Sequence, residues 1–217
     1  MQDVLPTLDR WREAGRRAAI ATVTRVHGSS PRPAGARLAI ADDGEFVGSI
    51  SVGCVEADVF EDAQEVLRTG RPKHRHFGIA DEVGFTVGLS CGGEIDVWIE
   101  PDWLSALPEA AVAAELRHCL AAEAGACLVT TLPDAGQLRH MLVRVDGTCV
   151  GLIGDLALHS SIVADARRLL DRGVSDTIDY PQAAGGSLAA FLDAYPPPPT
   201  LLIFGGTSVA VPLAAFA

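Results

Sequence analysis

Residues 44–70 are GEFVGSISVGCVEADVFEDAQEVLRTG, and residues 147–173 are GTCVGLIGDLALHSSIVADARRLLDRG. The two segments align without a gap, and Gly48 then matches Gly151. Apolar residues bounded by glycine predict a strand, a turn and an amphipathic helix in each segment. We interpret the match as an internal duplication. It predicts two similar strand–strand–helix halves that share a core about a pseudo-twofold axis.

The residues before and within the first copy predict the rest of this plan. A helix is expected at about 4–15 and an apolar strand at 18–26. A hairpin is expected around Asp43-Gly44, because Asp-Gly favours a tight turn between two strands. The following helix, expected from about Cys54 to Arg68, ends before Gly70, as helices often do. The predicted fold class is therefore α/β, with one domain over residues 1–195.

The composition changes after this domain. Four consecutive prolines lie within a stiff linker at residues 196–200. Residues 201–217, LLIFGGTSVAVPLAAFA, predict the first strand, glycine turn and helix start of a truncated Rossmann-like domain. Thr207 and Ala210 stand where a dinucleotide fingerprint has its second and third glycines, so the nucleotide-binding signal is weak.

Charge and composition exclude several functional classes. The net charge of -11 argues against an extended nucleic-acid surface. No apolar stretch has the length of a membrane span, and the N-terminus lacks the apolar region of a signal peptide. Five cysteines without a C-x-x-C motif argue against a disulfide framework or a zinc ribbon. We therefore expect a cytoplasmic protein without a membrane span.

The two copies differ at three positions that could carry chemistry. Gly53, Cys54 and Glu56 of the first copy align with leucine, alanine and histidine in the second. Because apolar fold-determining positions persist in both copies, this asymmetry indicates a role other than folding. At the first turn of the predicted helix, unpaired N–H groups and the helix dipole would favour the thiolate form of Cys54. The alternative is a small buried hydrophobic side chain at a crowded turn.

A loop over residues 27–37, HGSSPRPAGAR, also occurs only in the first half. Its hydroxyl, amide and guanidinium groups suit a phosphate or a carboxylate. These groups come from Gly28, Ser29, Ser30, Arg32 and Arg37. The alternative is a solvated connection between two strands.

A second cysteine lies among glycines in GLSCGGEIDVWIEP, residues 88–101. Cys91, Gly92 and Gly93 indicate either backbone exposed to a ligand or a glycine-rich hairpin. The other cysteines, Cys119, Cys127 and Cys149, fall on a predicted helix and two predicted strands, so core positions are expected for them.

Two further patterns bear on metal binding and on hydrolysis. His74 and His76 alternate in PKHRHF without a nearby carboxylate or cysteine in the sequence, which favours an exposed strand over a metal site. No motif typical of a hydrolase is present.

Taken together, four segments resemble the XdhC/CoxI family, maturation proteins of molybdenum hydroxylases such as xanthine dehydrogenase and carbon monoxide dehydrogenase. The matching segments are ATVTRVHGSSPRPAGARLAI, GSISVGCVEADVFEDA, GLSCGGEIDVWIEP and PPPPTLLIFGGTSVAVPLA. They cover most of the chain in order, and the first three are specific when they occur together. Proteins of this family are similar in having such an N-terminal domain followed by a Rossmann domain.

The resemblance implies a cofactor-insertion chaperone rather than an enzyme. Its cofactor would be the molybdenum cofactor, as molybdopterin or its cytosine dinucleotide form. It would hold this cofactor during sulfuration and deliver it to the apo-hydroxylase, with a cysteine desulfurase-type sulfur donor and a second copy of the chain as further partners. Cys54 and Cys91 are the expected reactive residues. The expected cofactor-binding residues are Gly28, Ser29, Ser30, Arg32, Arg37, Gly53, Cys54, Glu56, Cys91, Gly92 and Gly93, and we expect no metal site built from protein ligands.

Three alternatives remain open from the residues alone. A thiol redox enzyme would use Cys54 and Cys91 as a pair. A nucleotide-dependent oxidoreductase would require a complete Rossmann domain. A scaffold would bridge the hydroxylase and the sulfur donor without holding the cofactor.

Overall fold

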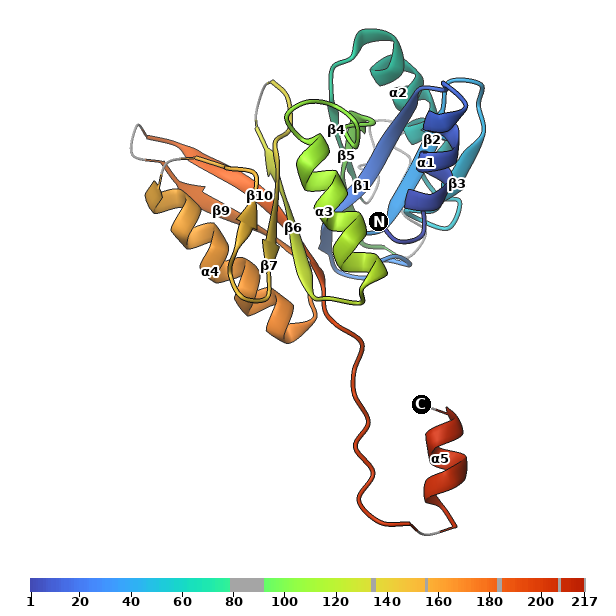
Figure 1. Ribbon diagram of the computed structural model, residues 1–217. Helices are drawn as coiled ribbons and strands as arrows, with labels where there is room; N and C mark the ends of the chain where they lie inside the picture. Colours follow the sequence, from blue (N-terminus) through green and yellow to red (C-terminus); the bar gives the residue numbers. More distant parts are fainter. Residues whose placement is uncertain (79–91, 134–135, 155, 183–184, 207, 217) are drawn as a thin grey trace.

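The computed structural model describes residues 1–78, 92–133, 136–154, 156–182, 185–206 and 208–216. Within these residues the chain forms two five-stranded antiparallel sheets, shown in Figure 1. Sheet A has the order β3-β2-β1-β5-β4, and sheet B has the order β8-β7-β6-β10-β9. The strands of each half therefore follow the same spatial order, which agrees with an α/β chain of two similar halves.

The elements of the two halves correspond one to one. The first half contains α1 (Leu5–Glu13), β1 (Ala18–His27), β2 (Arg37–Ala41), β3 (Phe46–Gly48), α2 (Glu56–Thr69), β4 (Lys73–Phe77) and β5 (Glu94–Pro101). The second contains α3 (Ala110–Ala121), β6 (Ala126–Leu132), β7 (His140–Arg144), β8 (Cys149–Val150), α4 (Leu156–Arg172), β9 (Asp176–Pro181) and β10 (Ser187–Tyr195). Both segments of the aligned repeat thus form a short strand, a turn and a helix.

A helix covers the outer face of each sheet. Because side chains alternate along a strand, Ala21 and Val23 of β1 pack with Val59 and Val66 of α2. The equivalent helix α4 covers sheet B through the same alternation. Burial of side chains of this size contributes about 1.5–3 kcal/mol each, so the outer helices are integral to the fold.

The other face of each sheet contributes to a shared inner core. Ile20 of β1 and Leu128 of β6 belong to one cluster that also contains Trp11 of α1 and Leu116 of α3. Neither half could bury this apolar surface without the other. The two halves therefore form one hydrophobic unit.

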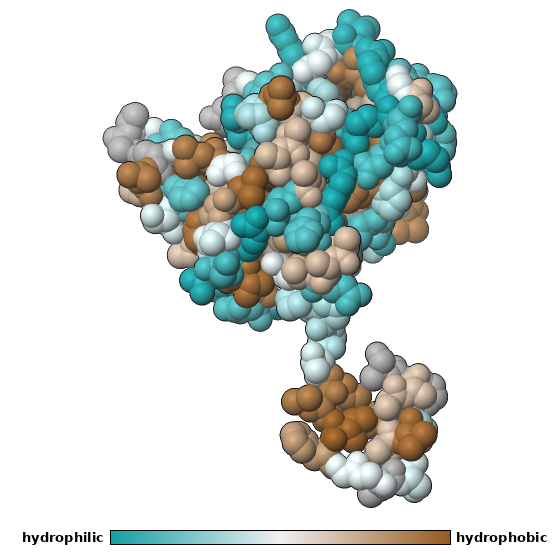
Figure 2. Space-filling model, in the orientation of Figure 1, coloured by the Kyte–Doolittle hydropathy of each residue, from teal (hydrophilic) through white to brown (hydrophobic). Residues whose placement is uncertain are grey.

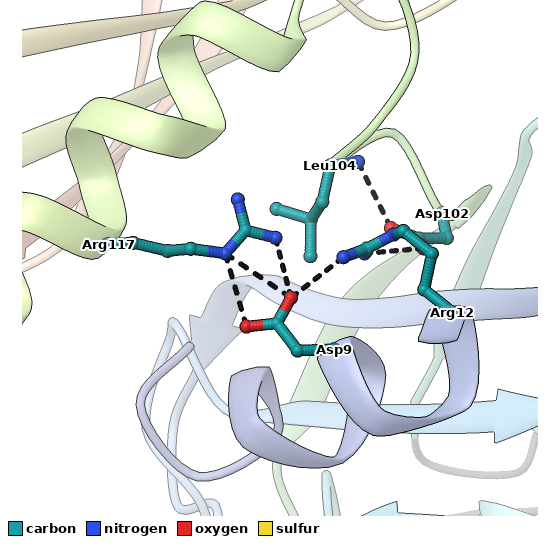
Figure 3. A network of polar contacts seen from close by, with 5 residues as sticks. All are labelled: Asp9, Arg12, Asp102, Leu104 and Arg117. Atoms are coloured by element: carbon teal, nitrogen blue, oxygen red, sulfur yellow. Dashed lines mark hydrogen bonds and ion pairs between the residues drawn. The ribbon is translucent and has the colours of Figure 1, made fainter. Parts of the chain in front are cut away.

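A polar network fastens α1 to α3 at the edge of this core (Figure 3). Asp9 of α1 accepts hydrogen bonds from Arg117 of α3, with Nη2 at 2.7 Å from Oδ1, and from Arg12 at 2.7 Å. Arg12 also donates to Asp102, whose other oxygen accepts the Leu104 amide at 3.0 Å. Arg117 thus joins α3 of the second half to Asp9 of the first half, while Arg12 binds the same carboxylate from within α1.

The tail, residues 196–217, differs from the sequence prediction in one respect. Residues 201–204 do not form a strand, although α5 (Ala210–Phe216) forms near the expected helix. An isolated strand has no partner for its backbone N–H and C=O groups, so it does not persist alone. Figure 1 shows the tail leading away from the sheets, and Figure 2 shows it as a strongly apolar surface. Phe204 is 94% exposed.

Among the described residues, no helix is long and apolar enough to cross a membrane.

Candidate functional site

Three segments singled out in the sequence emerge at the same end of sheet A. β1 ends at His27 beside the first residue of β5, Glu94, and β2 begins beside the end of β3, where Leu38 pairs with Gly48. The antiparallel register therefore places the loop over residues 28–36, the loop over residues 49–55 and the glycines before β5 at one edge. We call these three segments the loop cluster.

Two of these segments are in direct contact. A Cβ added to Gly28 would lie 3.6 Å from the Cα of Gly93, and one added to Gly93 would collide with the backbone of Ser29. A side chain at residue 93 is therefore excluded by the neighbouring loop. The glycine pattern around residue 93 thus permits close packing of two backbones, in addition to any role toward a ligand.

Glu56 organises the loop that carries Cys54. Its carboxylate accepts backbone N–H bonds from Ile50 at 3.2 Å, Ser51 at 2.9 Å, Gly53 at 2.8 Å and Val55 at 3.3 Å. Successive amides that converge in this way form a nest suited to an anion. Here the anion is part of the chain itself.

This arrangement corrects the expected position of Cys54. Helix α2 begins at Glu56, with Val55 as its N-cap, so Cys54 lies in the loop and not in the first helical turn. The reason is local: Val52 and Gly53 have positive φ angles of 60° and 104°, which the convergence of amides on Glu56 stabilises. These amides donate to the carboxylate of Glu56.

Hydrogen bonding also keeps Glu56 ionised. Burial alone would raise the pKa of its carboxyl, but the Ser51 hydroxyl, backbone amides and the Ser49 hydroxyl at 2.8 Å lower it to about 2. A ligand anion would have to displace this carboxylate to reach the nest. We therefore assign Glu56 to loop structure and leave direct ligand contact by Glu56 and Gly53 as a prediction.

The side chain of Cys54 is half-buried. It packs against the apolar cluster beneath α2, which Val26 and Ala36 at the two ends of the neighbouring loop also contact. Cys91, the second expected reactive residue, lies outside the described residues, so the pairing of Cys54 with Cys91 is untested.

The arginines of the loop over residues 27–37 lie in different surroundings. Arg32 is partly exposed and faces Asp3, with Nη2 at 3.5 Å from Oδ2, while the Ser30 hydroxyl donates to the Arg32 carbonyl at 2.8 Å. Arg37, by contrast, is buried against Asp193 of β10 at 2.7 Å. Arg37 was expected to meet a ligand. Its guanidinium instead joins the two halves, so we leave it out of the proposed site.

The segments of the loop cluster lie at one end of sheet A, but the side chains of Cys54 and Arg32 are on different faces of the sheet. Cys54 packs on the outer cluster, whereas the Arg32 partner Asp3 precedes Val4 of the inner core. A single cleft that holds both Cys54 and Arg32 stays a prediction.

The remaining cysteines occupy the positions expected of them. Cys119 and Cys127 are buried in the inner and outer cores, and burial raises the pKa of Cys127 well above its ordinary value. Cys149 is half-buried on β8 against the core beneath α4. None of the three is therefore part of the loop cluster.

Sequence reasoning missed the carboxylate partner of the two histidines. Pairing of β4 with β5 places Asp96 beside both, with its Oδ1 at 2.9 Å from His76 Nδ1 and 3.3 Å from His74 Nε2. The signal was the alternation H-x-H on one strand and D-x-W on another, which becomes informative only when the strands pair. No group of three or more His, Cys, Asp or Glu side chains able to hold a metal occurs among the described residues.

The fold and the loop cluster define a duplicated α/β protein with a cysteine-bearing edge on its first sheet. Residues 11–78, which contain two of the three segments of the loop cluster, match the model of the XdhC and CoxI family. The resemblance of the chain to this family is thereby confirmed.

Curated relatives match the chain over part of its length. It is 34% identical over 82 residues to the molybdenum cofactor insertion chaperone PaoD of Escherichia coli K12, a match that covers 38% of this chain and 26% of the relative. It is 33% identical over 97 residues to a probable xanthine dehydrogenase component of Bacillus subtilis, and this match covers 43% and 29%. The chain thus matches less than a third of the length of either relative.

A solved structure has the same fold. The crystal structure of a xanthine dehydrogenase from Bacillus halodurans superposes with a TM-score of 0.63 at 22% sequence identity. The match covers 90% of this chain and 53% of the other. At this identity it supports the two-sheet architecture and no more.

Proposed function

We propose that the chain takes part in inserting the molybdenum cofactor into a molybdenum hydroxylase, as a chaperone. The observation that carries the proposal is the loop cluster, where Cys54 and the loop over residues 28–36 emerge together within the segment that matches the XdhC and CoxI family. The relative named as a molybdenum cofactor insertion chaperone supports the same role.

The chemistry of the loop cluster fits this cofactor. Its molybdenum and dithiolene end is soft, so the half-buried thiol of Cys54 is a suitable neighbour. When bound, the cofactor supplies the molybdenum centre that the hydroxylase requires. Its phosphate end needs cationic and N–H donors.

Existing contacts of the expected binding groups favour Arg32 as the cation for that phosphate. The amides over residues 50–55 already bind Glu56, and Arg37 is buried against Asp193. Arg32 remains, and its 3.5 Å ion pair with Asp3 joins partly exposed groups and is therefore weak. In the proposal, Arg32 turns to the phosphate while Ser29, Ser30 and the backbone at Gly28, Gly92 and Gly93 line its approach.

The finer steps belong to the same proposal. The chain holds the cofactor, as molybdopterin or its cytosine dinucleotide form, while a cysteine desulfurase-type donor supplies sulfur. It then passes the cofactor to the apo-hydroxylase, and a homodimer is the assembly we expect for this transfer.

The test compares two half-buried cysteines. Cys54→Ser replaces a soft thiol in the loop cluster, whereas Cys149→Ser makes the same change at a half-buried position in the second half. After anaerobic purification, we expect Cys54→Ser to retain several-fold less molybdenum and pterin than the wild type, with a similar melting temperature. Cys149→Ser should retain the wild-type amounts. Equal retention in both variants would refute the role of the loop cluster.

A further inference from the structure

A cleft of about 320 Å³ opens between the two sheets, and Ala34 of the loop cluster packs in the same apolar cluster as its lining residues Leu132 and Trp98. Sheet A contributes Arg25, His74, Asp96 and Trp98 to its lining. Sheet B contributes the opposite wall, with Leu132, Pro133 and Ala189 and the polar rim residues Thr177 and Asp179. Clefts between two similar halves are frequent sites for small ligands.

The cleft straddles the pseudo-twofold axis. His74 pairs with Trp98 in sheet A as Thr177 pairs with Phe191 in sheet B, so His74 and Thr177 are equivalent positions. By the same register, Asp96, which pairs with His76, is equivalent to Ala189, which pairs with Asp179. Equivalent positions of the two halves therefore line the same cleft.

The equivalent positions differ in chemistry. The first half presents an imidazole and a carboxylate where the second presents a hydroxyl and a methyl group. Folding requires neither His74 nor Asp96, since the second half builds the same sheet without them. The asymmetry produces one polar aromatic wall and one largely apolar wall.

The cleft wall formed by sheet A also contains a β-bulge that sheet B lacks over its described residues. The register of β1 against β5 shifts between Val23 and Arg25, while β6 pairs with β10 without a shift over its described residues. Bulges commonly re-aim side chains beside binding sites. Thr24, the extra residue, and Arg25 both line the cleft.

The polar wall favours a neutral ligand with hydrogen-bond donors over an anion. Arg25 is already paired with Asp179 at 3.2 Å, so its charge is matched. Both imidazoles contact Asp96 through Oδ1. Hydrogen bonding with His74 lowers the pKa of Asp96 to about 2, so the carboxylate is ionised at neutral pH.

The two walls also favour a planar ligand. The rings of His74 and Trp98 lie 5.2 Å apart with a tilt of 30° and line the cleft together with the apolar Leu132 and Pro133. An aromatic face and an apolar face can enclose a flat ring. The ionised carboxylate of Asp96 lies beside this aromatic face and can accept N–H bonds from the edge of a ring.

We propose that this cleft binds the 2-amino-4-oxopyrimidine edge of a planar bicyclic heterocycle, such as a pterin or guanine, with Asp96 accepting its N–H groups and Trp98 stacking on its ring. This inference adds a ligand site to the proposed function. It rests on the proposed function only where it names a pterin as the natural ligand. Binding of the isolated ring is measurable independently of molybdenum.

The experiment measures binding of free heterocycles by calorimetry. Pterin is compared with lumazine, which carries oxygen in place of the 2-amino group, and guanosine is compared with xanthosine for the same reason. We expect pterin to bind at least about tenfold more tightly than lumazine, because only pterin can donate a hydrogen bond from a 2-amino group to the charged carboxylate of Asp96. Tighter binding of guanosine than of pterin would assign the cleft to a nucleotide.

Two variants and a control separate recognition from folding. Asp96→Asn should abolish the preference for pterin over lumazine, whereas Trp98→Leu should weaken both ligands alike. Glu94→Gln is the control, because Glu94 lies two residues before Asp96 on β5 and is not among the residues that line the cleft. Melting curves of all three variants check that they fold.

Equal binding of pterin and lumazine, or a preserved preference in Asp96→Asn, would overturn the inference. Molybdenum retention that depends on Cys54 would then still support the proposed function. Conversely, pterin binding could depend on Asp96 while Cys54→Ser retains the wild-type amount of molybdenum. This result would overturn the role of the loop cluster but support the cleft as a pterin site.

Discussion

Arg37 and Asp193 form a buried ion pair between the two halves, with Nη1 at 2.7 Å from Oδ2 and side chains 4% and 6% exposed. The hydroxyl of Tyr195 joins both residues. A second buried pair, His140 Nε2 and Glu100 Oε1 at 3.2 Å, also crosses between the sheets.

The two pairs are related by the duplication. Arg37 begins β2 opposite Thr22, and His140 begins β7 opposite Thr130. Glu100 lies opposite Ile20, two residues before Thr22, and Asp193 lies opposite Leu128, two residues before Thr130. Each half therefore supplies a basic group to the equivalent carboxylate of the other.

Breaking the first pair should be strongly destabilising. Burial alone would lower the pKa of Arg37, yet Tyr195 and Asp193 raise it above its ordinary value, so the guanidinium stays charged. We expect Asp193→Asn to lower the free energy of unfolding in urea by about 3–5 kcal/mol. Glu100→Gln should cost less, about 1–2 kcal/mol, because the glutamine amide oxygen can still accept a hydrogen bond from the imidazole of His140.

A double variant checks the cause. Arg37→Met combined with Asp193→Leu removes both charges, so it should regain much of the stability lost in Asp193→Asn. If the double variant is as unstable as the single one, an unpaired buried charge is not the reason for the loss.

Stability should fall in acid through Glu56. The folded pKa of about 2 lies below the unfolded value of 4.5, so the contribution is complete above pH 4.5 and is lost as the pH falls toward 2. After allowance for its partial exposure, we expect about 1–2 kcal/mol. Glu56→Gln should be less stable at pH 7 and less sensitive to pH over this interval. The exposed Glu61→Gln on the same helix should retain the wild-type pH profile.

Two equivalent glycines should be intolerant of a side chain. Gly48 and Gly151 both have φ of 90°, and an added Cβ would collide with the carbonyl oxygen of Arg37 or approach that of His140 to 2.8 Å. Each alanine variant should lose about 2–4 kcal/mol by chemical denaturation. Gly53→Ala shares the positive φ but meets nothing within 4 Å, so it should lose only about 1 kcal/mol. Equal losses of stability at all three positions would mean that backbone strain alone, and not the collision of the added Cβ, causes the destabilisation.

Cleavage in the tail should leave the two-sheet body intact. Leu201, Leu202 and Phe204 are at least half exposed, and the segment forms no strand with either sheet. Limited proteolysis should therefore cut first within residues 196–209 and leave a fragment close to 1–195. Its melting temperature should equal that of the whole chain. A clear decrease would show that the tail contributes to the core.

The sequence by itself determined the duplicated plan of strand, turn and helix, because apolar periodicity and the glycines that end elements act on neighbouring residues. It also indicated the loop cluster, since Gly53, Cys54 and Glu56 differ from their counterparts in the second copy. Antiparallel pairing then brings these segments to one edge without further information.

Only the tertiary structure decided which polar groups meet. Arg37 belongs to a loop that suggested a ligand, but its partner Asp193 comes from the other half and could not be found from local pattern. Glu56 accepts hydrogen bonds from the amides of its own loop, and helix α2 therefore begins after Cys54. His74 gained Asp96 across a strand pair, and the cleft formed where two sheets face each other. Such contacts depend on the packing of segments far apart in the chain, and a one-dimensional pattern carries no record of that packing.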